Sequence, residues 1–208
     1  MPYLSINFAN PVECYDNFMN KCAGKYCHVE ISVTIDVQVL RVLINFAQND
    51  AFNPQMCQTL LNNLKQKKGE MNIAFYILFG DVVSLRILNE MEEDTFLKPA
   101  KHPIYSMLKI PVEEEKLHEV ITWNVKHLGR KYDIPRALLL LTPWSLPLGG
   151  PPEDFFCSQI IMYMIKENDL VPVEEDLDID HMKPDDVYRW LFTKLSSIKE
   201  EVNSENGE

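Results

Sequence analysis

The sequence predicts an α+β fold, in which helices pack on an antiparallel sheet. Runs with β-strand alternation fall in the first half of the 208 residues, and runs with helical spacing dominate the second half. Two of the strand runs, 72–79 and 82–88, are joined at Gly80-Asp81, which is a hairpin signal. Antiparallel strands with segregated helices are typical of the α+β class.

The clearest strand covers residues 28–35, H-V-E-I-S-V-T-I, where β-branched apolar residues alternate strictly with polar ones. One face of this strand is therefore apolar, and the other face carries His28, Glu30, Ser32 and Thr34. We expect the apolar face to pack against the core. Weaker patterns predict further strands over 3–8 and 105–110.

Helical spacing and end signals predict helices over 54–67, 113–128, 136–141, 160–166 and 184–195. Asn53 followed by Pro54 is a typical helix start, and Gly129 is a typical residue after a helix end. The apolar stretch 37–47 fits either a strand or a helix by its pattern.

The composition, 46% hydrophobic and 25% charged residues, is that of an ordinary globular protein. We expect a single domain over residues 1–198 and a flexible acidic tail over 199–208. The net charge is −11 and no basic stripe occurs, which argues against a nucleic-acid partner. Most of the negative excess lies in residues 166–208, as a solvated surface or as a docking surface for a protein partner.

The five cysteines form an odd set without regular spacing, and Met1-Pro-Tyr-Leu-Ser5 lacks the basic start of a signal peptide. Reduced thiols and a cytoplasmic location are therefore expected. No apolar run reaches the length of a membrane span. Zinc ligation by Cys14, Cys22, Cys27 and His28 is an alternative, but their spacing matches none of the usual ligand patterns, so we expect no metal and no cofactor.

The stretch Asp154-Phe-Phe-Cys-Ser-Gln159 follows a loop rich in proline and glycine, residues 142–153, and opens a helical run. Asp154 is predicted to cap that helix, which places Cys157 in its first turn. Backbone amides and the helix dipole there favour a thiolate, which is the nucleophilic form of cysteine. The spacing of Cys157 with Ile160, Ile161 and Met164 equally fits a buried core stripe.

A nucleophilic cysteine needs a base, and the polar face of strand 28–35 offers one. His28 and Glu30 project from this face about 7 Å apart along the strand, so the carboxylate can orient the imidazole. A solvated strand face on which His28 and Glu30 have no chemical role is the other interpretation.

Four segments, taken in order, resemble one family. They are Tyr26-Cys-His-Val-Glu-Ile31, Leu128-Gly-Arg-Lys-Tyr-Asp133, Phe155-Phe-Cys-Ser-Gln159 and Met182-Lys-Pro-Asp-Asp-Val187. They are similar to the histidine strand, the "L-G-x-x-Y-D" turn, the "F-x-C-S-E/Q" nucleophile segment and the "P-x-D-L" element of circularly permuted papain-like cysteine hydrolases. This is the NlpC-like superfamily, and the YiiX/YaeF-like branch is the most similar.

The resemblance implies a permuted papain-like fold with the nucleophile at the start of a late helix. It assigns the nucleophile to Cys157, the general base to His28 and the orienting group to Glu30. Tyr132 would line the substrate cleft or pack in a tight turn, and loop 144–152 would form a wall or lid over the cleft or act as a simple connector. The chain departs from bacterial members in residues 37–70, an insert that replaces a glycine-rich hairpin.

The expected function is that of a thiol hydrolase, such as a cysteine peptidase or amidase, which cleaves an amide or ester bond in a peptide or acyl substrate. One alternative is a lipid or thioester acyltransferase of the same fold. Another is a catalytically silent papain-like module that binds a protein through its acidic C-terminal face.

Overall fold

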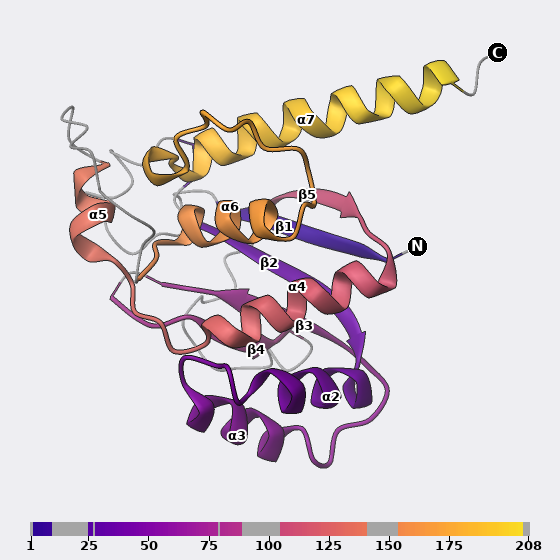
Figure 1. Cartoon of the computed structure of the whole chain (residues 1–208), viewed down its shortest axis with the longest axis vertical. Coiled ribbons are helices and arrows are strands. Elements are labelled where there is room, and N and C mark those ends of the chain that lie inside the picture. The colour runs from indigo at the N-terminus through magenta and orange to yellow at the C-terminus, as the bar shows by residue number, and fades with distance from the viewer. Residues whose placement is uncertain are drawn as a thin grey trace.

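The computed structural model describes residues 2–9, 25–26, 28–78, 80–88, 105–140 and 154–205. Within these ranges, one antiparallel sheet of five strands has the order β4-β3-β2-β1-β5 (Figure 1). The strands are β1 (Tyr3–Ala9), β2 (His28–Asp36), β3 (Glu70–Tyr76), β4 (Ser84–Ile87) and β5 (Tyr105–Pro111). The α+β class and the β3–β4 hairpin are confirmed, whereas the permuted papain-like arrangement stays a prediction.

The described helices are α2 (Val37–Ala47), α3 (Pro54–Asn63), α4 (Glu114–His127), α5 (Ile134–Leu139), α6 (Cys157–Glu167) and α7 (Pro184–Glu205). The ambiguous stretch 37–47 is helix α2, because Asp36 ends β2 and its carboxylate accepts a hydrogen bond from the amide of Gln38 at 2.7 Å. Helix α7 continues through residues 199–205, which belong to the predicted tail (Figure 1). No helix in the described ranges is long and apolar enough to cross a membrane.

Strand β2 lies at the centre of the sheet, and its apolar face is covered by helices. Ile31 pairs with Ile6 of β1 and with Phe75 of β3, which continues the apolar face across three strands. Helices α4 and α6 lie over this face (Figure 1). A void of about 10 Å³, lined by Val29, Phe75, Asn124, Ile160 and Ile161 among others, shows that side chains of both helices meet the sheet here.

The opposite face of β2 is buried at Glu30 and Ser32 and exposed only further along at Thr34, contrary to the interpretation of a solvated face around Glu30. Asn7 of β1 lies opposite Glu30, and both residues are less than 10% exposed. The Asn7 amide nitrogen donates to the Ser32 hydroxyl at 2.8 Å. Polar groups removed from water need partners, so this face must satisfy its own hydrogen bonds and charges.

The segment after α4 connects the β3–β4 hairpin to the start of α6. Gly129 donates to the Val83 carbonyl at 2.9 Å, and Tyr132 donates to the Asp81 carbonyl at 2.9 Å. On its other side, Tyr132 forms a parallel bridge with Phe155. The "L-G-x-x-Y-D" segment is therefore a short piece of extended chain that fixes where the Cys157 helix begins.

We predict that Gly129→Ala destabilises the protein much more than Gly69→Ala. Both glycines have positive φ values, +88° and +75°, so each alanine bears the cost of a left-handed conformation, roughly 1–2 kcal/mol. At Gly129 a Cβ would also lie 2.6 Å from the Cβ of Asn53, the N-cap residue of α3, whereas nothing lies within 4 Å at Gly69. Urea unfolding of the two variants measures the difference, and equal losses would contradict the steric argument.

Candidate active site

The structure brings Cys157 and His28 together from opposite ends of the chain. His28 is the first residue of β2 and Cys157 is the first residue of α6, and these two elements pack against each other. Cys157 is 5% exposed, and the His28 side chain is 14% exposed. The strand face and the helix start that were predicted separately thus form one buried cluster.

The protonation of His28 is governed by its two neighbours. Burial by itself lowers the pKa of His28, but interaction with Cys157 and with the nearby Glu30 carboxylate outweighs burial and raises the pKa to about 9. His28 is therefore an imidazolium at neutral pH. A cation in this position needs a negative partner, and the carboxylate of Glu30 supplies one.

Glu30 is held by a residue that the sequence did not point to. Its Oε2 lies 3.7 Å from the Nε2 of His28, which is longer than a hydrogen bond, and this Nε2 has no hydrogen-bond partner among the described residues. By contrast, the Nη2 of Arg86 lies 2.6 Å from both carboxylate oxygens of Glu30. Burial alone would raise the pKa of Glu30, but His28 and Arg86 lower it below its ordinary value, so the carboxylate stays ionised.

The prediction that Asp154 caps the Cys157 helix is wrong. The carboxylate of Asp154 accepts from the Lys131 amide at 3.1 Å, and the N-cap residue of α6 is Phe156. The bridge between Tyr132 and Phe155 keeps the chain extended beyond Asp154, so the helix begins at Cys157 and not directly after Asp154. Phe156 cannot accept a hydrogen bond through its side chain, and among the described residues no side-chain cap occurs at this helix start. The first-turn amides are therefore available to an anion at Cys157.

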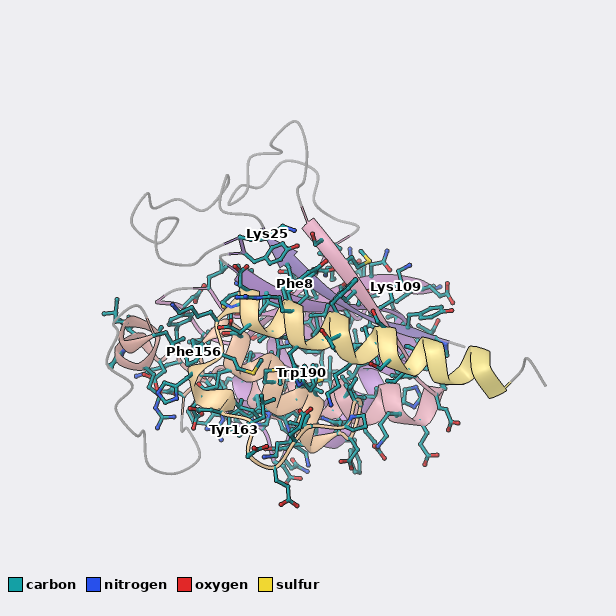
Figure 2. All side chains as sticks on the ribbon, turned by 90° about the horizontal axis from the view of Figure 1, so that it is seen from above. Phe8, Lys25, Lys109, Phe156, Tyr163 and Trp190 are labelled. Atoms are coloured by element: carbon teal, nitrogen blue, oxygen red, sulfur yellow. The ribbon has the colours of Figure 1, made fainter. Side chains whose placement is uncertain are left out.

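The two polar residues after Cys157 anchor the first turn of α6. The Ser158 hydroxyl donates to the Met182 carbonyl at 2.7 Å, and the Gln159 amide donates to Asp180 Oδ1 at 2.6 Å. Tyr163 donates to the same oxygen at 3.2 Å. Figure 2 shows Phe156 at the start of this helix and Tyr163 further along it. The first turn is therefore tied to the chain that precedes α7.

Helix α7 in turn positions the residues that lead into β2. The two carboxylate oxygens of Asp185 accept from the amides of Lys25 and Tyr26, each at 2.7 Å. The Tyr26 ring is buried, and Phe8 and Tyr188 pack around it. Figure 2 shows Phe8 and Lys25 near the beginning of α7. Asp185 thus fixes the chain shortly before His28.

Tyr132, the predicted cleft residue, is half-buried within electrostatic reach of Cys157. Burial, followed by the negative charges of Cys157 and Asp133, raises the pKa of the Tyr132 phenol. The phenol therefore stays protonated and keeps an O–H that can donate a hydrogen bond. Its role in binding substrate stays a prediction.

Cys57 contrasts with Cys157. It is fully buried on α3, and burial raises the pKa of its thiol, as expected of a core cysteine. Cys14, Cys22, Cys27 and loop 144–152 lie outside the described residues. Within the described ranges, no group of three or more His, Cys, Asp or Glu side chains is arranged to hold a metal.

Comparison with known proteins does not extend these observations. Scans of protein-family models, curated proteins and solved structures each found no match to this chain. The resemblance to papain-like hydrolases therefore depends on the four sequence segments alone.

We predict that the pKa values of two partly buried histidines, His28 and His127, are shifted in opposite directions. His28 should lose its proton near pH 9, whereas burial lowers the pKa of His127 below 6.5; His127 stacks on Trp123 with ring centres 3.8 Å apart. NMR of the imidazole carbons against pH measures both, with His28→Gln and His127→Gln to assign the signals. A His28 titration midpoint at or below 6.5 would show that His28 forms no ion pair with Cys157 or Glu30.

Proposed function

We propose that this chain is a cysteine hydrolase of permuted papain-like fold that cleaves an amide or ester bond. The observation that supports the proposal is the placement of His28 between Cys157 and Glu30, whose interactions with the imidazole raise its pKa to about 9. A thiol, an imidazole and a carboxylate in this order form the arrangement that activates a nucleophilic cysteine.

The first half of the reaction transfers the acyl group to the enzyme. The thiolate of Cys157 attacks the substrate carbonyl and forms a carbon–sulfur bond. The bond to the amine or alcohol then breaks, and His28 gives its proton to that leaving group. Because Nε2 faces Glu30, we assign Nδ1 of His28 to the thiol and the leaving group.

The second half releases the acid. Neutral His28 takes a proton from water, the water oxygen attacks the thioester, and the Cys157 thiolate leaves as the imidazolium is restored. Negative charge develops on the carbonyl oxygen in both halves. The uncapped start of α6 offers the Cys157 amide as a donor to this oxygen. Glu30 holds the imidazole in place, and Tyr132 offers a further hydrogen bond to the substrate.

The low exposure of Cys157 favours one alternative, a papain-like module that binds a protein partner without catalysis. A thiol that is 5% exposed meets an acyl group only after the groups around it move. In this alternative the acidic C-terminal face is the docking surface. The reactivity of Cys157 separates the two functions, because a silent module has no need for an activated thiolate.

We expect Cys157 to react with iodoacetamide faster than Cys57 at pH 6, and the reaction to depend on His28. In His28→Ala the rate at pH 6 should fall by about tenfold or more, since an unassisted thiol ionises near pH 8.5. Peptide mass spectrometry measures each cysteine separately, and Cys57→Ala serves as the control. Equal slow reaction of Cys157 in wild type and His28→Ala would favour the silent module.

Incubation with activated esters and amides should give an acyl-enzyme. We expect an increase in intact mass equal to the acyl group, followed by its hydrolysis, in wild type. Cys157→Ser should accumulate no thioester, because a serine hydroxyl beside His28 is a far weaker nucleophile at neutral pH. A panel of p-nitrophenyl esters and peptide amides tests the bond class, with mass spectrometry as the readout. Acylation that persists in Cys157→Ser would place the reactive group elsewhere.

A further inference from the structure

Arg86 makes the closest contact to the candidate site from outside the predicted residues. It lies on β4, two strands away from Glu30 on β2, and reaches it diagonally across β3, where Ala74 is the partner of Arg86 in the sheet register. In the sheet register Ser32 pairs with Ala74 and Ala74 pairs with Arg86, so all three side chains share one face. Ala74 is fully buried and small, which leaves the guanidinium a path across β3 to Glu30.

The contact between Arg86 and Glu30 is close and well shielded from water. One guanidinium nitrogen lies 2.6 Å from both oxygens of a carboxylate whose side chain is 5% exposed, and the Arg86 side chain is 23% exposed. The guanidinium carbon also lies 4.9 Å from the centre of the Tyr76 ring. These contacts hold both oxygens of the Glu30 carboxylate.

The charges of the cluster balance only when Arg86 is included. With Cys157 as thiolate and His28 as imidazolium, Glu30 adds a second negative charge in a buried site. A buried carboxylate without a cation tends to bind a proton, because burial disfavours its charged form. Arg86 supplies the second positive charge, so that two anions face two cations.

We propose that Arg86 is a positioning residue that keeps Glu30 ionised and directed at His28, and thereby sets the lower pH limit at which Cys157 stays reactive. The inference depends on the proposed hydrolase site and adds to it a mechanism of pH regulation. In this role Arg86 acts on His28 and Cys157 through Glu30.

Other groups face this pair from each neighbouring element. His28 faces Glu30 from the same strand, Cys157 faces His28 from α6, and Asn7 lies opposite Glu30 on β1 as an uncharged amide. From β3, Tyr76 lies against Arg86, and burial raises the pKa of its phenol so that it stays neutral. Among these described groups, Arg86 is the cation that contacts the carboxylate of Glu30 from outside the Cys157–His28 pair.

The test is a double-mutant cycle read through the alkylation of Cys157. The rate with iodoacetamide is measured from pH 4.5 to pH 9 in wild type, Arg86→Met, Glu30→Gln and the double variant. We expect Arg86→Met to move the half-maximal pH upward by about one unit, which is about tenfold in rate at a fixed lower pH. In the Glu30→Gln background the same change should move it clearly less, since the carboxylate on which Arg86 acts is gone.

Two further variants test specificity. Arg86→Lys keeps the charge and should shift the profile less than Arg86→Met. Arg41→Met removes an arginine of α2 whose side chain contacts Gln38 and should leave the profile unchanged. Thermal melting verifies that each protein is folded. If Arg86→Met alone does not fold, the comparison is made with Arg86→Lys in the two backgrounds.

The outcomes separate this inference from the proposed function. An equal upward shift in both backgrounds, or no shift in either, would overturn the role of Arg86 while wild-type Cys157 still reacts in a His28-dependent way. Loss of that His28 dependence in wild type would instead contradict the hydrolase proposal, whatever Arg86 does.

Discussion

The balance of charge at the junction of β2 and α6 is the constraint on which the rest of this region depends. A strand that begins with His28 and carries Glu30 on a buried face must supply partners for both, because ionised groups removed from water are costly when unpaired. Cys157 meets the imidazole from the helix start, and Arg86 meets the carboxylate across β3. Strand β4 carries Arg86, and the small side chain of Ala74 leaves room for the guanidinium to cross β3.

Polar side chains outside the junction of β2 and α6 hold these two elements in position. Ser158 and Gln159 tie the first turn of α6 to residues 180–182, and Asp185 at the start of α7 binds the amides just before His28. Tyr132 and Phe155 pair to set the point at which α6 begins. The four segments that resemble the hydrolase family are thus neighbours in space, which gives a physical reason for their joint occurrence in one sequence.

The elements of this site could be predicted from local pattern, but its completion could not. Alternation in 28–35 identified the strand and its polar face, and the residues before and after Cys157 identified a helix start. Arg86 escaped notice because its relation to Glu30 depends on the register of three strands, β2, β3 and β4, and a sequence gives only the hairpin of the last two. Asp154 was misplaced for a similar reason. Its carboxylate accepts a hydrogen bond from the amide of Lys131, which lies on another segment, and does not cap the helix that follows it.

The burial of these charged side chains bears on whether they contribute to stability or to function. Replacing a buried ion pair by well-packed apolar side chains is often neutral or stabilising by about 1–4 kcal/mol, so stability alone is a weak reason to keep one. Cys57 shows how this fold treats a cysteine that only fills space, since it is buried on α3 and burial raises the pKa of its thiol. Cys157 is almost as buried, yet it lies at an uncapped helix start against an imidazole whose pKa is raised to about 9. Strongly perturbed titratable groups gathered around a nucleophile are a feature of functional sites, and this contrast within one chain is the reason we favour chemistry over packing at Cys157.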